Sequence, residues 1–295
     1  MRLNRTNVRI GIDRLGPNRP VRRCVRGMTM VLPRRHLLPY MATEGSPYAQ
    51  NLVDLAQVLG RTTKDLVVLD VGANVGDSAL LIRDRVRCRI VCVEGDPYWL
   101  DYLDKNVAGV ADVVVEPVLL SADGEQRVDI VRADVGTSRV RPARGTAGTA
   151  TVPVGELLAR RPELDRVRLV KSDTDGFDLP LALAYARTFS RSRPVIFFEY
   201  DPRLCLPGAD PAAVWGDLAG LGYERATVWT NGGHVLGTAD VRDLGTRCRV
   251  LTAGGADPGY QFWDVAVAHR DDADGCAALD EVAARGVQWQ GAGRV

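Results

Sequence analysis

Acidic residues end several apolar stretches of this sequence, at positions where they could bind a ligand or move a proton. Asp70 ends "LVVLD", and Glu94 ends the next such stretch, "IVCVE". Lys171, Asp173 and Asp175 alternate in "VKSDTDG", so in an extended chain they point to one face. These residues provide carboxylates and one ammonium group for binding or for acid–base chemistry.

The later acids allow three interpretations. In the first, Asp173 or Asp175 is a general base, and Lys171 orients the acceptor or lowers the pKa of the carboxylate. In the second, Asp173, Asp175 and Glu199 hold a divalent cation such as Mg²⁺, which prefers oxygen ligands. In the third, Lys171 only forms a structural ion pair. His234, in "TNGGH", is a further candidate base.

The turn "DVGANVG" follows the first apolar stretch. Gly72 and Gly76 permit a close approach of backbone to a ligand, and Asn74 tolerates left-handed geometry. No GK[ST] follows, and the spacing differs from the GxGxxG of dinucleotide sites, which disfavours a nicotinamide dehydrogenase. Asp70 would repel a phosphate but suits an ammonium or a sulfonium group. Glu94 can accept hydrogen bonds from the hydroxyls of a ribose. The combination indicates S-adenosylmethionine.

Apolar stretches alternate with helical patterns, which predicts a doubly wound α/β sheet with its ligand at the carboxyl ends of the strands. A hairpin is expected over 122–140 and a loop over 141–154. A helix is expected to begin at Ser46, followed by proline. Seven strands are predicted, within 66–72, 88–97, 112–121, 167–176, 193–202, 223–233 and 260–270.

Five segments occur in the order "LDVGANVGDSALLI", "VCVEGDP", "LLSADGE", "LVKSDTDGFDLPLAL" and "PVIFFEYDP". Together they resemble the FkbM family of S-adenosylmethionine-dependent methyltransferases over roughly residues 46–269. The resemblance implies a Rossmann-like methyltransferase fold, with a seven-stranded, mostly parallel sheet and an antiparallel last strand. It also implies O-methylation of a small molecule in natural-product or sugar tailoring.

The resemblance implies roles for single residues as well. The glycine turn would hold the methionine part of the cofactor, Glu94 the ribose, and the region of Ser121 would flank the adenine. Asp175 stands where the family has Glu. The cofactor residues implied in this way are Asp70, Gly72, Ala73, Asn74, Gly76, Asp77, Ser78, Glu94, Gly95, Asp96, Ser121 and Asp173.

Charge is uneven along the chain, although the formal net charge of the 295 residues is only +1. Residues 1–35 carry ten arginines and one acid, Asp13. We expect this Arg-rich N-terminal extension, residues 1–45, to be a solvated or partly disordered arm. A substrate cap or a basic lip for an anionic substrate is the alternative. Nucleic acid is not expected, because no aromatic residue interleaves with the arginines.

The remaining composition indicates an ordinary soluble enzyme. The six cysteines form no C-x-x-C, which argues against structural zinc and a disulfide framework. No apolar run approaches ~20 residues and no signal peptide is recognisable, so we expect a cytoplasmic protein without a membrane partner. A methyltransferase domain is expected over 46–270 and a C-terminal tail with a short helix over 271–295. A homodimer is left open.

The function predicted from the sequence is S-adenosylmethionine-dependent O-methylation of a small-molecule hydroxyl. N-methylation of a small-molecule amine is the alternative within enzymes. A non-catalytic S-adenosylmethionine-binding protein is the alternative from another class.

Overall fold

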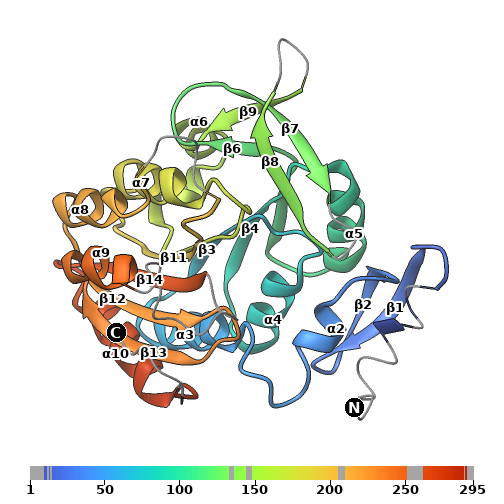
Figure 1. The fold of residues 1–295 in the computed structure, drawn as a ribbon, viewed down its shortest axis with the longest axis horizontal. Coiled ribbons are helices and arrows are strands. Elements are labelled where there is room, and N and C mark those ends of the chain that lie inside the picture. Colours follow the sequence, from blue (N-terminus) through green and yellow to red (C-terminus); the bar gives the residue numbers. More distant parts are fainter. Residues whose placement is uncertain are drawn as a thin grey trace.

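An eight-stranded sheet forms the centre of the molecule (Figure 1). The structure is a computed structural model and describes residues 10–11, 13, 15–132, 136–143, 148–204, 210–250, 262–288 and 290, with backbone alone at 247–250. In sheet order the strands are β13 (Val235–Asp240), β12 (Tyr223–Thr230), β14 (Trp263–His269), β11 (Val195–Tyr200), β10 (Leu169–Ser172), β3 (Val67–Val71), β4 (Arg89–Val93) and β5 (Val113–Glu116).

Five neighbouring strands, from β11 to β5, are parallel. Strand β14 lies antiparallel between β11 and β12, and β13 is antiparallel to β12. The predicted Rossmann-like α/β fold with an antiparallel last strand is therefore confirmed. The predicted count of seven strands is one short, because β13 adds an eighth.

Helices cover both faces of the sheet (Figure 1). Alternate residues of a strand face opposite sides, so Val68 packs in the cluster beneath one layer and Leu69 in the cluster beneath the other. One layer consists of α3 (Gln50–Thr62), α4 (Asp77–Arg85) and α10 (Ala273–Arg285). The other consists of α6 (Val154–Arg160), η1 (Pro162–Arg166), α7 (Asp178–Thr188), α8 (Ala213–Gly220) and α9 (Val241–Val250).

A small second sheet, drawn in green at the top of Figure 1, lies over one end of the central sheet. Its order is β6 (Leu119–Ser121), β9 (Thr149–Pro153), β7 (Arg127–Arg132) and β8 (Ser138–Pro142). The hairpin predicted over 122–140 is confirmed as β7 and β8. The single strand predicted over 112–121 is wrong, because Pro117 has no N–H for the ladder and separates β5 from β6. The loop predicted over 141–154 contains β9 instead.

The N-terminal extension is folded where the structure describes it. It forms a hairpin of β1 (Pro20–Val25) and β2 (Met28–Pro33), followed by α2 (Leu38–Met41). Its buried side chains pack on α5 (Pro97–Val107) in a separate cluster of Val25, Met30, Leu32, Leu38, Ala42, Val75, Trp99 and Tyr102. Asn106 of α5 fastens β2, because it accepts a bond from the amide of Val31 (2.7 Å) and donates one to its carbonyl (3.0 Å). The expected solvated arm is therefore wrong for residues 20–42.

The segment between the extension and α3 differs from the prediction. Helix α3 begins at Gln50 and not at Ser46, because Ala49 has a left-handed backbone with φ of 56°. Tyr48 is consequently in a turn, and its amide hydrogen bonds to the Ser46 hydroxyl (3.3 Å).

Helix α10 is the helix predicted in the C-terminal tail. It is not peripheral, because Leu279 and Val282 are buried in the same cluster as α3. No helix in the described ranges has both the length and the apolar character needed to cross a membrane.

Replacement of Met30 by alanine tests whether the extension belongs to the folded domain. Met30 is fully buried, so the cavity should lower the free energy of unfolding by about 2–5 kcal/mol. Urea denaturation measures the change, and exposed Arg22→Ala on β1 is the control, with an expected change within about 0.5 kcal/mol. Equal stability of the two variants would show that the extension does not pack as described.

Candidate functional site

The turn after β3 touches the turn after β10. Gly72 has a φ of +69°, and a Cβ there would lie 1.9 Å from the carbonyl oxygen of Asp173. The amides of Gly72 and Ala73 both donate to the carbonyl of Val93 at 3.0 Å, which ties the turn to β4 as well. Gly76, also left-handed, ends the turn as the N-cap of α4. Gly72, predicted for ligand approach, is thus also needed for the contact between the turns, whereas a Cβ at Gly76 would meet the Leu103 side chain of α5 at 2.8 Å.

A buried ion pair fixes this turn. Lys171 Nζ lies 3.1 Å from Asp70 Oδ1, with 8% and 1% of the two side chains exposed. Lys171 also donates to the carbonyl of Gly72 (2.8 Å), and the Ser78 hydroxyl donates to Asp70. Burial lowers the pKa of Lys171, but the carboxylates, Asp70 foremost, raise it above its ordinary value. Lys171 therefore keeps its proton, and Asp70 is already engaged by two partners within the chain.

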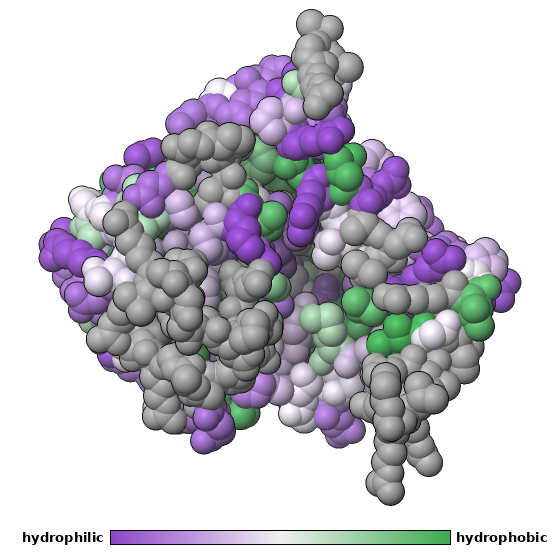
Figure 2. Space-filling view, in the orientation of Figure 1, coloured by the Kyte–Doolittle hydropathy of each residue, from purple (hydrophilic) through white to green (hydrophobic). Residues whose placement is uncertain are grey.

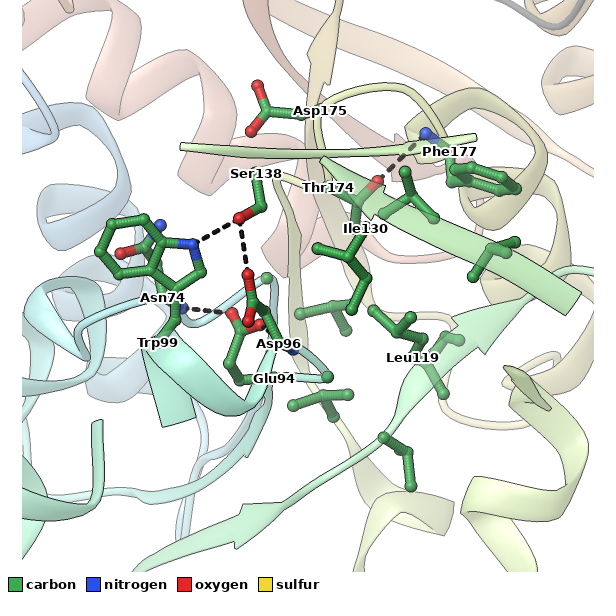
Figure 3. Close-up of a pocket in the computed structure, with 18 of the residues that line it drawn as sticks. Asn74, Glu94, Asp96, Trp99, Leu119, Ile130, Ser138, Thr174, Asp175 and Phe177 are labelled. Carbon is green, nitrogen blue, oxygen red and sulfur yellow. Dashed lines mark hydrogen bonds between the residues drawn. The ribbon is translucent and has the colours of Figure 1, made fainter. Parts of the chain in front are cut away.

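Glu94 lies at the carboxyl end of β4, beside the glycine turn (Figure 3). Its carboxylate accepts hydrogen bonds from the amides of Asn74 (2.9 Å) and Asp96 (2.8 Å). Asn74 also donates through its side chain to the carbonyl of Gly136, 2.9 Å away, and so joins the turn to the small sheet. Burial raises the pKa of Glu94, and the two amide bonds oppose that rise.

Asp96 continues this row of polar groups. One of its oxygens caps α5 by accepting from the amide of Tyr98 (2.9 Å), and the other accepts from the Ser138 hydroxyl (2.8 Å). The indole N–H of Trp99 donates to the same hydroxyl at 2.6 Å (Figure 3). Ser138, at the start of β8, thus fastens the small sheet to α5.

These groups line one side of a cavity of about 660 Å³, counting its open mouth, which we call the cofactor cavity after the ligand predicted from the sequence. Gly95 lies at its edge, where a Cβ would meet the Leu119 side chain at 2.2 Å. Ser121 does not line it, and its buried hydroxyl donates to the carbonyl of Gly124 (2.6 Å). The opposite wall is apolar and consists mainly of Val118, Leu119, Leu120, Val128, Ile130, Val140 and Phe177.

A second cavity, of about 1220 Å³, adjoins the first and contains the acids predicted to face an acceptor, so we call it the acceptor cavity. The two share Gly72, Asn74, Asp173 and Asp175 in their linings. A hollow is visible near the middle of the molecular face in Figure 2, with hydrophilic and hydrophobic residues around it. The shared residues mark the point where a ligand in one cavity would meet a ligand in the other.

Carboxylates dominate the acceptor cavity. Burial raises the pKa of Asp77 to about 6 and that of Asp264 to about 7. The pKa values of Asp175 and Glu199 are also raised, first by burial and then by the charge of nearby Asp173. Asp173 itself is exposed. Asp173, Asp175 and Glu199, which were predicted to gather at this edge, are therefore together, and the pKa values of Asp175 and Glu199 are raised.

The structure gives no support for a metal centre. In the part of the chain that it describes, no group of three or more His, Cys, Asp and Glu side chains is arranged to hold a metal ion. This includes Asp173, Asp175 and Glu199, the ligands considered for Mg²⁺.

The two histidines near the acceptor cavity differ in position. His36, from the extension, lines the cavity, and burial lowers its pKa to about 4, so it is neutral at physiological pH. His234 is in the loop between β12 and β13, and its amide donates to the hydroxyl of Thr230 (3.2 Å). From that loop Asn231, rather than His234, contributes to the lining.

Sequence reasoning missed three polar residues of the site. Asn51 and Asp264 meet in the acceptor cavity through a 2.9 Å hydrogen bond, and Ser138 holds the rim of the cofactor cavity. Asp264 had a recognisable signal, since it is a single acid inside the apolar strand "FWDVAV". Ser138 had none, because its role depends on how the hairpin folds back over α5.

Comparisons with known proteins show only distant similarity. No protein-family model matches the chain, and no curated protein matches its sequence. One similar solved structure is an O-methyltransferase from Bacillus cereus in complex with SAH, at 16% identity over 75% of this chain and 80% of that one, with a TM-score of 0.39. A putative O-methyltransferase from Klebsiella pneumoniae shares 16% identity over 74% and 80%, with a TM-score of 0.41.

A third similar structure is a fibrillarin/Nop5p complex, at 12% identity over 70% of this chain and 73% of that one, with a TM-score of 0.41. These values are too low to transfer a function from any of the three proteins to this chain.

The ion pair of Lys171 and Asp70 is expected to contribute to the stability of the fold. Lys171→Met leaves the carboxylate of Asp70 buried without its cation, which should cost about 3–5 kcal/mol of unfolding free energy. Adding Asp70→Asn should recover part of that loss, so the double-mutant cycle should show strong coupling. Thermal and urea unfolding measure the four variants. Exposed Lys105→Met is the matched control and should cost about 0–1 kcal/mol. A similar loss of stability at both lysines would contradict the role given to the Lys171–Asp70 ion pair.

Proposed function

We propose that this chain is an S-adenosylmethionine-dependent methyltransferase of the FkbM type, which methylates a hydroxyl group of a small molecule. One observation carries the proposal. The Glu94 carboxylate lies in an apolar-walled cavity that continues, past the glycine turn, into a second cavity lined by acids. This arrangement suits a nucleoside joined to a cationic amino acid, with space for an acceptor beyond it.

The residues present fit the cofactor. Its adenine would occupy the apolar part of the cofactor cavity, near Leu119, and Glu94 would accept its ribose hydroxyls. Its methionine end would follow the glycine turn towards Asp77 and Asp173. A pyrophosphate fits poorly, because the Glu94 and Asp96 carboxylates would repel it.

The other cofactor residues implied by the family resemblance would support the site without contacting the ligand through their side chains. Asp70 and Ser78 fix the turn from within the chain, and Ser121 supports the strand that carries the apolar wall. The backbone of the turn, with Ala73 and Asn74, approaches the ligand.

When bound, the cofactor supplies a methyl group on a sulfonium, which an acceptor oxygen can displace. The chain must then hold the acceptor hydroxyl in line and remove its proton. Asp175 suits the role of base, since its pKa is raised by burial and by Asp173, and it lines both cavities. Lys171 keeps its proton and acts as a positioning residue, and His234 is the alternative base.

Cofactor binding can be tested by isothermal titration calorimetry. S-adenosylmethionine and S-adenosylhomocysteine should bind, and NAD should not bind measurably. Glu94→Ala removes hydrogen bonds to a charged group and should weaken binding of S-adenosylhomocysteine by about tenfold to a hundredfold. Exposed Glu125→Ala should leave it unchanged. The cofactor assignment would be refuted if NAD bound as tightly as S-adenosylhomocysteine, or if Glu94→Ala bound S-adenosylhomocysteine as tightly as the wild type.

The base assignment is tested with an acceptor found by screening small hydroxylated molecules for release of S-adenosylhomocysteine. Asp175→Asn should lower kcat by about 10²–10⁴-fold, the usual contribution of a general base, and leave the Kd for S-adenosylhomocysteine within about threefold. Asp165→Asn, on the exposed surface of η1, is the control. Full activity of Asp175→Asn would transfer the role to Asp173 or His234. Cofactor binding without turnover on any acceptor would favour the non-catalytic alternative.

A further inference from the structure

The described lining of the acceptor cavity carries more acidic than basic side chains. Lys171 is the one Lys or Arg among the described residues of its lining, and Asp70 already pairs with it. His36 is neutral. The acids that remain in the lining are Asp77, Asp173, Asp175, Glu199 and Asp264.

Two of these acids face each other on the side away from the glycine turn. Glu199 of β11 and Asp264 of β14 are directly opposite partners in the antiparallel register. Side chains at such positions lie on the same face, about 4.5–5.5 Å apart at Cβ, and like charges there destabilise the sheet. Asn51 donates to Asp264 (2.9 Å) but brings no positive charge. The pKa values of both carboxyl groups are raised, so the free pair relieves its repulsion by holding protons, and a cation bound between them would let both ionise.

The cofactor does not account for this pair. The proposed place of its cationic methionine end is along the glycine turn, where Asp77 and Asp173 lie. Glu199 and Asp264 come from strands on the other side of β10, so they face the acceptor.

Aromatic side chains contribute to the same lining. Tyr48, Phe197 and Phe262 line the acceptor cavity. The hydroxyl of Tyr48 forms no hydrogen bond with a described residue, and its pKa is raised, first by burial and then by Asp77, Asp173, Asp264 and Glu199. The phenol is therefore neutral and has four carboxylates near it. An aromatic ring next to carboxylates is a favourable environment for a desolvated ammonium group.

We propose that the acceptor carries a protonated amine in addition to its hydroxyl, and that this ammonium binds between Tyr48 and the pair Glu199 and Asp264. The inference rests on the proposed function and defines its substrate class as a hydroxylated amine. The ammonium provides the charge that the lining lacks and three N–H donors for its oxygens. Held there, the amine orients the acceptor so that its hydroxyl faces Asp175.

The probes for this proposal are glucosamine, which has hydroxyls and an ammonium, and N-acetylglucosamine, which has no charge. With the protein saturated by S-adenosylhomocysteine, calorimetry should show glucosamine binding at least about tenfold more tightly, as a desolvated charge pair predicts. Glu199→Gln and Asp264→Asn should each remove most of that preference. Tyr48→Phe should keep it and Tyr48→Ala should weaken it, because the ring faces the ammonium. Asp165→Asn is the control.

The two variants that remove a crowded carboxylate should fold, and a thermal melt is expected to show an unchanged or higher Tm. Equal binding of the two sugars, or binding of neither, would overturn the inference. The same calorimeter cell reports S-adenosylhomocysteine binding, so the inference can fail while the cofactor assignment stands. If the wild-type protein does not bind S-adenosylhomocysteine at all, the proposed function itself is overturned.

Discussion

The site depends on the close contact between the turns after β3 and β10. Gly72 lies against the carbonyl of Asp173, and Lys171 reaches back from β10 to Asp70 and to the carbonyl of Gly72. The contact needs the missing side chain at Gly72, and the ion pair makes it rigid, because breaking it leaves a buried charge. The cofactor and acceptor cavities meet at this contact, so the same interaction fixes both.

The small sheet and the N-terminal extension complete what the central sheet begins. The small sheet provides the apolar wall of the cofactor cavity and is held at the rim by Ser138 and Gly136. The extension packs on α5 and contributes His36 to the acceptor cavity. The doubly wound sheet alone would leave both cavities open. Segments far apart in the sequence therefore come together at one edge of the sheet to complete their walls.

The sequence was informative where one local pattern determines the structure. Strands buried on both faces are continuous apolar runs, and the acids at their ends necessarily reach the same edge of a parallel sheet. Strand β13 was missed because "VLGTAD" has a glycine and few strand formers. The extension was misread because its many arginines obscured a few apolar residues, such as Met30 and Leu32 of β2, that are fully buried. The pairing of Glu199 with Asp264 depends on a register between distant segments, which no local pattern reveals.

The left-handed residue Ala49 delays the start of α3 and leaves Tyr48 in a turn at the wall of the acceptor cavity. The acceptor cavity is thus lined partly by connecting segments and partly by the late strand β14, whereas the glycine turn and the end of β4 line the cofactor cavity. The two halves can therefore diverge separately in evolution. Under the proposed function, changes near Tyr48 or Asp264 would alter which acceptors bind and leave the proposed site of the methyl donor undisturbed.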